Sequence, residues 1–314
     1  MGSRVRHYDV VIVGAGPAGM SASMWCNELR LNSVLIERSR EPGGQLHFIY
    51  NSVNNYIGLN AGNGRELLDQ FLRSDPRPLE CALLETDVTE VNSLDALVTL
   101  SDGRKFSADA VILATGVRRR RLGVAGERRL VGSGILRSGV GDSEMTRGRV
   151  VAIVGGGDAA VENAIVLSHL ASKVYLIHRG TKLSARPEFI SRAKAEGRIE
   201  FLYGTKVTSI SGRGILESIE VIEITTGKSK RLNIDNLLIR IGVEPNSELV
   251  LGQVELDDKG YVLVDRSGRS SNSKIYAIGD VASPLSPTIA TACGMGATAV
   301  KTIASLLDSR GLEE

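Results

Sequence analysis

Apolar and polar positions follow a repeating order along this chain: a short apolar run, a glycine-rich turn, and small and apolar residues at helical spacing. The order appears over residues 8–29 and again over residues 149–170, each time followed by a second short apolar run. Buried parallel strands read as continuous apolar runs, whereas helices repeat about every 3.6 residues. The chain therefore contains an internal duplication of a strand, a turn and a helix.

Other apolar runs predict further elements. Residues 110–113 and 275–278 are short apolar runs that lead directly into turns, which predicts buried strands. Residues 199–231 alternate apolar and polar positions, which predicts antiparallel strands on the edge of the second domain. Residues 288–307 carry small and apolar residues at helical spacing and predict a closing helix.

This order of elements predicts an α/β fold made of two Rossmann-like, three-layer ββα dinucleotide-binding domains, the second inserted in the first. The first domain is expected to comprise residues 1–118 and 245–314, and the second residues 119–244. The predicted hinges are the glycine-containing stretches 116–126 and 242–246.

The first glycine turn has the context that dinucleotide binding requires. A strand leads into Gly14-x-Gly16-x-x-Gly19, a small-residue helix follows, and Glu37 lies eighteen residues beyond Gly19 at the end of a second strand. Such a loop lets the backbone approach a pyrophosphate, and the helix N-terminus supplies free amides and partial positive charge. Glu37 is suited to accept hydrogen bonds from ribose hydroxyls. A glycine turn alone also arises from tight packing, but strand, helix and acid together predict a nucleotide site.

The second glycine turn differs from the first at the position of the acid. It reads Gly155-x-Gly157-x-x-Ala160, and the residue eighteen beyond Ala160 is His178, followed by Arg179. A carboxylate at this place would repel a 2′-phosphate, whereas Arg179, aided by His178 or Arg186, would neutralise one. NADPH is therefore favoured, and NADH remains an alternative. Solvated surface arginines are the competing interpretation.

Composition removes several classes of function. The 314 residues include 38 Lys and Arg and 36 Asp and Glu, a net charge of +2, so nothing draws the whole chain to nucleic acid or a membrane surface. We see no apolar run of about 18 residues and no room for a signal peptide, which predicts no membrane span and a cytoplasmic location. The three cysteines, Cys26, Cys81 and Cys293, stand far apart, so neither a disulfide framework nor a metal site is expected.

A family resemblance follows from a set of motifs in fixed order. The motifs are Gly14-Ala-Gly-Pro-Ala-Gly19, Gly43-Gly44-Gln45-Leu46, Asn55-Tyr56-Ile57-Gly58, Ala114-Thr115-Gly116, Gly155-Gly-Gly-Asp-Ala-Ala160, His178-Arg179 and Gly279-Asp280. With them the chain resembles low-molecular-weight thioredoxin reductase over essentially its whole length. The resemblance implies a homodimer, FAD in the discontinuous domain and NADPH in the inserted domain.

The resemblance also implies which residues bind each cofactor. The glycines of the first turn would meet the FAD pyrophosphate, Glu37 its adenosine ribose, Gln45 and Asn55 the riboflavin half, and Asp280 the ribityl chain. The helix that starts near Thr288 would direct its positive end at the flavin. The full expected FAD set is Gly14, Gly16, Pro17, Ala18, Gly19, Glu37, Gly44, Gln45, Asn55, Val88, Ala114, Thr115, Gly116, Gly279, Asp280, Thr288, Ile289 and Ala290. The expected NADPH set is Gly155, Gly157, Asp158, Ala159, His178, Arg179 and Arg186.

One departure from the family pattern bears on the chemistry. Thioredoxin reductases carry Cys-x-x-Cys-Asp just before the second glycine turn, and here Ser138 and Gly141 occupy the cysteine places while Asp142 keeps the acid. Serine and glycine cannot cycle between thiol and disulfide, so we do not expect thioredoxin reduction. Asp142 is either a proton donor or a turn and cap residue. Ile57 replaces a family proline, and Gly180 replaces a second arginine of the basic motif.

The remaining chemistry is hydride transfer from nicotinamide to flavin, which requires mainly positioning. The acceptor would then take electrons directly from flavin, as a small acidic carrier such as ferredoxin or flavodoxin, a quinone or oxygen. Thioredoxin-reductase-like ferredoxin-NADP reductases, which also lack the cysteine pair, are the nearest functional model. The run at 118–121, four arginines, would contact such a carrier or form intramolecular salt bridges at a hinge.

Two alternatives stay open: a flavin-binding protein with little turnover, and an atypical disulfide reductase that uses Cys26, Cys81 or Cys293. Free cysteine is usually a packing residue, which disfavours the second.

Overall fold

The computed structural model describes residues 5–282 and 285–311, and the chain divides into two compact units. Unit 1 comprises Met1–Arg118 and Glu244–Glu314, and unit 2 comprises Arg119–Val243. Unit 2 is therefore an insertion in unit 1. The chain crosses between the units in β9 (Val117–Arg119) and β18 (Val243–Pro245), and these two strands pair with each other.

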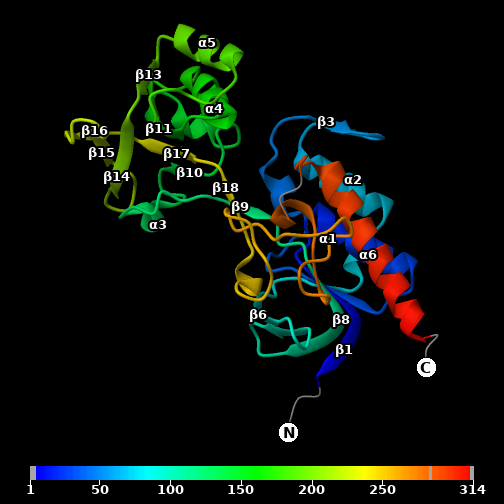
Figure 1. Ribbon diagram of the computed structural model, residues 1–314. Coiled ribbons are helices and arrows are strands. Elements are labelled where there is room, and N and C mark those ends of the chain that lie inside the picture. Colours follow the sequence, from blue (N-terminus) through cyan, green and yellow to red (C-terminus); the bar gives the residue numbers. More distant parts are fainter. Residues whose placement is uncertain (1–4, 283–284, 312–314) are drawn as a thin grey trace. The chain divides into compact units, whose positions relative to one another are not determined.

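Unit 1 is built on a seven-stranded sheet, of which β1, β6 and β8 are labelled in Figure 1. The strand order is β5-β2-β1-β8-β7-β6, and β19 also pairs with β8. Strand β1 lies between two parallel neighbours, β2 and β8, which explains why its residues 10–13 are all buried. The strands are β1 (Arg6–Val13), β2 (Ser33–Ile36), β5 (Ala82–Leu83), β6 (Val88–Asn92), β7 (Leu97–Leu100), β8 (Lys105–Leu113) and β19 (Ile275–Ala277).

The two faces of this sheet are covered differently. Val10 and Ile12 of β1 pack with α1 (Pro17–Glu28) and α6 (Ile289–Gly311), whereas Val11 and Val13 pack with β6, β7 and part of segment 250–264. A smaller apolar cluster joins α2 (Gly64–Ser74) to the hairpin of β3 (Val53–Tyr56) and β4 (Leu59–Ala61). The result is the three-layer arrangement predicted from the sequence.

Small residues let α1 and α6 pack closely. A Cβ on Gly296 of α6 would lie 2.7 Å from the carbonyl oxygen of Ala18 in α1, so the helices meet at backbone distance. Helix α6 is the one described helix long and apolar enough to span a bilayer, with mean hydropathy 1.3 over the relevant window. The sequence analysis predicted a closing helix over 288–307 but expected no membrane span. Ala299, Val300 and Ile303 of α6 are buried in the core of unit 1, which accounts for part of this apolar character.

Unit 2 repeats the plan on a five-stranded parallel sheet of order β10-β17-β11-β12-β13. Helices α4 and α5 cover one face, and a three-stranded antiparallel sheet, β14-β15-β16, contributes the core on the other. The strands are β10 (Ile135–Leu136), β11 (Val150–Gly155), β12 (Lys173–Ile177), β13 (Ile199–Leu202), β14 (Thr205–Ser211), β15 (Ser218–Glu223), β16 (Ser229–Asn233) and β17 (Asn236–Arg240). The helices are α3 (Glu127–Leu130), α4 (Asp158–Ser168) and α5 (Pro187–Ala195).

The prediction for residues 199–231 is partly wrong. Strands β14, β15 and most of β16 are antiparallel as expected, but β13 pairs in parallel with β12. Helix α5 connects β12 to β13, and a helical crossover returns the chain in the parallel direction. Both predicted Rossmann-type domains are present, and the predicted α/β fold is confirmed.

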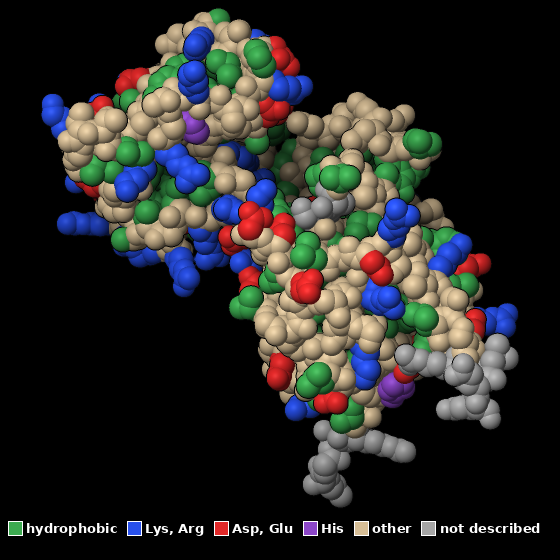
Figure 2. All heavy atoms as spheres, viewed as in Figure 1, with side chains coloured by type: hydrophobic (Ala, Val, Ile, Leu, Met, Phe, Trp, Pro, Cys, Tyr) green, Lys and Arg blue, Asp and Glu red, His purple; other side chains and the backbone are tan. Residues whose placement is uncertain are grey.

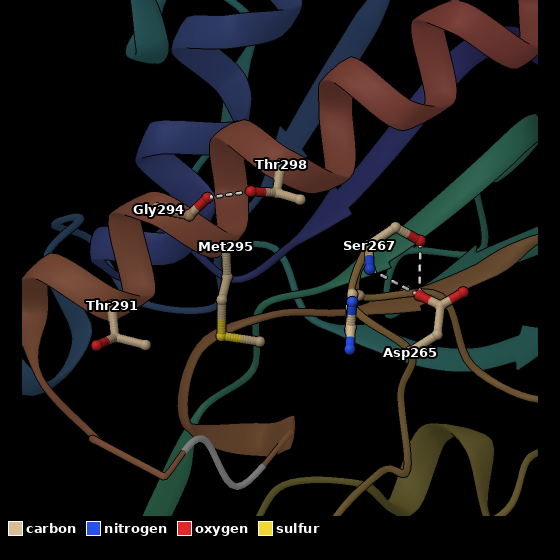
Figure 3. A pocket seen from close by; sticks show the side chains of 8 residues that line it. Asp265, Ser267, Thr291, Gly294, Met295 and Thr298 are labelled. Carbon is tan, nitrogen blue, oxygen red and sulfur yellow. Dashed lines mark hydrogen bonds between the residues drawn. The ribbon is translucent and has the colours of Figure 1, made fainter.

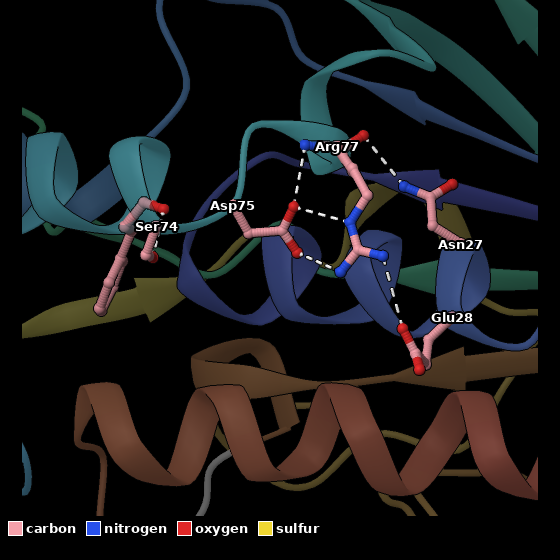
Figure 4. A network of polar contacts seen from close by, with 6 residues as sticks. Asn27, Glu28, Ser74, Asp75 and Arg77 are labelled. Atoms are coloured by element: carbon pink, nitrogen blue, oxygen red, sulfur yellow. Dashed lines mark hydrogen bonds and ion pairs between the residues drawn. The ribbon is translucent and has the colours of Figure 1, made fainter.

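A polar network attaches the segment after α2 to α1 (Figure 4). Arg77 forms an ion pair with Asp75 at 2.9 Å, a longer one with Glu28 at 3.5 Å, and accepts a hydrogen bond on its carbonyl from Asn27. The Arg77 guanidinium lowers the pKa of the Asp75 carboxyl. These contacts fix the loop in front of β5 and therefore belong to the fold of unit 1.

The two units carry opposite net charges. Unit 2 has 21 Lys and Arg and 12 Asp and Glu, a net of +9, whereas unit 1 has 17 and 24, a net of −7. Figure 2 shows many Lys and Arg side chains on the visible face of unit 2. The near-neutral net charge of the whole chain is therefore the sum of a basic unit and an acidic unit.

Candidate functional site

The first glycine turn, between β1 and α1, has no room for side chains at two of its three glycines. Gly14 has φ +106°, and a Cβ there would lie 2.5 Å from the carbonyl oxygen of Ala114. A Cβ on Gly19 would lie 1.8 Å from the carbonyl oxygen of Gly14. Gly16 faces open space, and α1 begins at Pro17 without a side-chain cap. The amides of the first helical turn are therefore left for a ligand.

A cavity of about 560 Å³ opens in front of this turn, wholly within unit 1. Fifteen of the eighteen residues predicted for FAD line it: Gly14, Gly16, Pro17, Ala18, Glu37, Gly44, Gln45, Val88, Ala114, Thr115, Gly116, Gly279, Asp280, Thr288 and Ile289. Gly19, Asn55 and Ala290 do not. Gly19 packs against the turn itself, Asn55 is exposed on the β3–β4 hairpin, and Ala290 is exposed on α6.

Glu37 connects the first turn to the end of β2. One carboxylate oxygen accepts from the amide of Ala15 and the other from the amide of Ser39, both at 2.8 Å. The residue is only 8% exposed, yet it lines the cavity. Each carboxylate oxygen can accept a second hydrogen bond, so Glu37 can hold the turn and two ribose hydroxyls together.

Asp280 lies at the opposite wall, in a 3₁₀ turn, Gly279–Ala282, directly after β19. Burial raises the pKa of its carboxyl above the ordinary value. A half-buried carboxyl group at a cavity wall is suited to a ligand with several hydroxyl groups.

Eight polar residues of the cavity lie outside the predicted FAD set: Arg38, Ser39, His47, Thr86, Asp87, Arg118, Asn246 and Glu248. Asn246 and Thr115 exchange two side chain to backbone hydrogen bonds of 2.7 Å. Arg118 contacts Glu244 at 2.8 Å, Asn246 at 2.9 Å and Glu248. Asn246 and Glu248 lie about 130 residues from Thr115 and Arg118, so no local signal marks them as cavity residues, although Asn246 is the last residue of the predicted hinge 242–246. Arg118 thus serves intramolecular salt bridges.

A second hollow of about 320 Å³ lies between the turn at 265–268 and one face of α6 (Figure 3). The Asp265 carboxylate there accepts from the amide and hydroxyl of Ser267 at 2.8 and 2.6 Å. Met295 and the Thr298 hydroxyl, which bonds to the Gly294 carbonyl, form the other wall. Asp265, Ser267 and Thr298 form their hydrogen bonds within the wall of the hollow, and it does not gather reactive side chains.

The second glycine turn, in unit 2, resembles the first in its backbone: a side chain is excluded at its first glycine, and the helix that follows has no side-chain cap. Gly155 has φ +154°, and a Cβ there would lie 2.2 Å from the carbonyl oxygen of Arg240. Helix α4 starts at Asp158, and its preceding residue, Gly157, provides no side-chain cap. The geometry fits a second pyrophosphate.

The three basic residues after β12 that are predicted to bind NADPH differ in their contacts and exposure. His178 packs against Gly156, where a Cβ would lie 2.3 Å from the imidazole Nδ1, and its Nε2 lies 2.9 Å from the Lys182 carbonyl oxygen. Arg186 pairs with Asp158 at 2.9 Å, and its guanidinium lies over the ring of Phe189. Arg179 is exposed and forms no ion pair with the described residues. The structure therefore leaves Arg179 available for an anion and commits Arg186 to the turn.

Comparison with known proteins gives the family. The family model for pyridine nucleotide-disulphide oxidoreductases matches residues 8–296. The chain belongs to the pyridine nucleotide-disulphide oxidoreductase family. It is 34% identical to a thioredoxin reductase of Listeria innocua over 95% of this chain and 93% of that protein, and 35% identical to one of Mycolicibacterium smegmatis over 93% and 94%.

A crystal structure of Lactococcus lactis thioredoxin reductase superposes with a TM-score of 0.80 at 29% identity, covering 96% of this chain and 99% of that one. The chain is thus a thioredoxin reductase-like member of the oxidoreductase family, whose relatives of this kind use FAD and NADPH. The residues of the first cavity and the second turn fit such cofactors, because both loops exclude side chains where a pyrophosphate needs backbone amides.

In this oxidoreductase the segment with Ser138, Gly141 and Asp142 is a closed turn after β10. One oxygen of Asp142, Oδ2, accepts from the amides of Arg137 and Ser138 at 2.8 and 2.9 Å. The Ser138 hydroxyl accepts from the amide of Gly141 at 3.0 Å, and Ser138 is only 4% exposed. A Cβ on Gly139 would overlap the side chain of Asn163 in α4. The turn is therefore held by its own polar groups.

The three cysteines of this family member are all free thiols. Cys26 is fully buried, and burial raises its pKa to about 12. Cys81 lies 3.3 Å from the Ser23 hydroxyl, and Cys293 is in hydrogen-bond contact with Tyr56, while burial raises the pKa of the Cys293 thiol. Thiols that stay protonated are poor nucleophiles. Among the described residues, no group of three or more His, Cys, Asp or Glu is placed to hold a metal.

Proposed function

We propose that this chain is an FAD-dependent NADPH oxidoreductase whose electron acceptor is not a disulfide. The observation that carries this proposal is the turn at Ser138, Gly141 and Asp142, which has no thiol where the resembled family has two. Burial raises the pKa of Cys26 and of Cys293, which disfavours both as members of a replacement pair.

In this proposal the cavity of unit 1 holds FAD, which supplies the electron-transfer chemistry when bound. The first glycine turn and the uncapped start of α1 bind the pyrophosphate. Glu37 orients the adenosine ribose, and Asp280 accepts hydrogen bonds from the ribityl hydroxyls. Both carboxyl groups line the cavity, Glu37 buried and Asp280 half-buried, and this position supports these roles.

Unit 2 binds the nicotinamide coenzyme at the second glycine turn. Arg179, exposed beside His178, pairs with the 2′-phosphate and selects NADPH over NADH. Asp158 and Arg186 keep the turn in shape through their ion pair. We further propose a cytoplasmic homodimer, which the resemblance to thioredoxin reductases supports.

The acceptor takes electrons from flavin directly and is a small acidic carrier such as ferredoxin or flavodoxin, a quinone or oxygen. The high positive charge of unit 2 supports an acidic carrier. Arg118 does not serve that contact, because its guanidinium is held by Glu244, Asn246 and Glu248.

The first experiment is anaerobic stopped-flow reduction of the purified flavoprotein by NADPH and by NADH, followed at the flavin absorbance band. We expect NADPH to bleach the flavin absorbance rapidly. Ferredoxin, flavodoxin, a quinone or oxygen should then reoxidise the flavin, and oxidised thioredoxin should not. Ser138→Ala is the matched control, since it removes the hydroxyl without altering any electron carrier. Efficient thioredoxin reduction would refute the proposal. No bleaching by either coenzyme would favour a flavin-binding protein with little turnover.

A further inference from the structure

The strand order of unit 2 indicates where the two ends of a dinucleotide lie. Strand β11, which leads into the second glycine turn, has β12 on one side and β17 on the other. The chain runs from β11 through β12 to β13, and then returns to the opposite side in β17. Ligands of such sheets bind beyond the carboxyl ends of the strands where the order reverses. An adenosine end beside Arg179, after β12, therefore leaves the other end over β17 and β10.

Strand β17 ends in Arg240 at this place. Leu238, two residues earlier, packs in the core under α4 and α5, and side chains alternate along a strand, so Arg240 belongs to the same face as the start of α4. The Arg240 carbonyl lies directly against Gly155 of the glycine turn. Arg240 is thus next to the pyrophosphate position and on the side away from Arg179.

The surroundings of Arg240 combine partial burial with a nearby like charge. Its guanidinium is partly buried and donates a hydrogen bond to the Ile239 carbonyl at 3.1 Å. Burial lowers its pKa to about 10, with a further lowering by Arg119 and a raising effect of Asp142. Arg119 donates to the Arg137 carbonyl, and Asp142 already accepts two amides on one oxygen.

The Arg240 guanidinium therefore lies in a half-buried place near a second cation, Arg119, and near the Asp142 carboxylate. Like charges with little solvent are costly unless an anion joins them. Arginine is suited to phosphate, because its planar fork donates two parallel hydrogen bonds. A dinucleotide supplies a phosphate on the side of the glycine turn where Arg240 lies.

We propose that Arg240 binds the nicotinamide-side phosphate of NADPH and thereby positions the nicotinamide half of the coenzyme. This inference rests on the proposed coenzyme function of unit 2, and it adds a residue from β17 to the basic residues that follow β12. The two arginines have distinct roles: Arg179 binds the 2′-phosphate, and Arg240 binds the phosphate on the nicotinamide side.

The test is a series of truncated ligands measured by titration calorimetry: NADP⁺, 2′-phospho-ADP-ribose, which lacks nicotinamide, and adenosine 2′,5′-bisphosphate, which also lacks the second phosphate of the bridge. Arg240→Gln should weaken the first two by about tenfold or more and the third by less than about twofold. Arg240→Lys should lie between wild type and Arg240→Gln. Arg179→Gln should weaken all three ligands, and Arg213→Gln, an exposed arginine between β14 and β15, should weaken none.

Unchanged binding of adenosine 2′,5′-bisphosphate shows that the variant is folded, so a loss for the longer ligands reports the missing contact. Equal weakening of all three ligands by Arg240→Gln, or weakening of none, overturns the inference while leaving the coenzyme proposal intact. Failure of the wild-type protein to bind any of the three overturns the coenzyme proposal and the inference with it.

Discussion

Substitution of Asp142 separates a structural carboxylate from a proton donor. Both amides that it accepts, from Arg137 and Ser138, end on the same oxygen, so asparagine can retain both bonds while losing the titratable proton. Alanine loses both. The Arg137 amide lies at an exposed residue and can be hydrated, but the Ser138 amide belongs to a buried one, and a buried orphan donor costs about 1–3 kcal/mol.

We therefore expect Asp142→Ala to lower the free energy of unfolding by about 2 kcal/mol, and Asp142→Asn by about 0.5–1 kcal/mol because its bonds are no longer charge-assisted. Denaturant unfolding, monitored by circular dichroism, measures the free energy of unfolding of both variants. Anaerobic reduction by NADPH and turnover with the best acceptor, from pH 6 to 8, should change by less than about twofold in Asp142→Asn. A loss of about tenfold or more in Asp142→Asn at nearly wild-type stability would refute the structural role and make Asp142 a proton donor.

Gly19→Ala should prevent stable FAD loading, because its Cβ would lie 1.8 Å from the Gly14 carbonyl oxygen; full flavin absorbance per mole of purified protein would contradict this. Burial raises the pKa of Asp280, so the flavin-free protein loses stability as pH rises from about 3.9 through the raised value. Asp280→Asn should therefore be more resistant to denaturant than wild type at pH 7 but not at pH values below about 3.5, and a less resistant apoprotein at pH 7 would oppose this. Arg77 lowers the pKa of Asp75, so the stability from this pair is present at neutral pH and lost as pH falls through the lowered value; Asp75→Asn should cost less than about 1 kcal/mol at pH 7, and a cost that persists in acid would show another cause.

The sequence predicts those parts of the molecule that depend on local backbone geometry. The first glycine turn and Glu37 are recognisable because strand, turn and helix are contiguous, and the cavity forms around them. Asn246 is missed because its partner Thr115 lies 131 residues away, and only the fold brings them together. The parallel pairing of β13 is missed because alternation of apolar and polar residues does not indicate a strand's partner. Likewise, the sequence does not tell whether Arg179 or Arg186 pairs with Asp158, because that depends on the tertiary structure.

The opposite charges of the two units predict opposite responses of the two ligands to salt. Both FAD and NADPH are anions, yet the cavity of unit 1 is lined by four carboxyl groups and two arginines within a unit of net −7, whereas the second turn lies in a unit of net +9. Screening of the long-range field should therefore weaken NADP⁺ binding several-fold between about 20 and 300 mM salt, but leave FAD retention unchanged or improved. Titration of NADP⁺ into the flavoprotein, and flavin release on dilution, measure the two responses. If both ligands weakened alike with salt, the local contacts of each turn, rather than the charge of its unit, would govern binding.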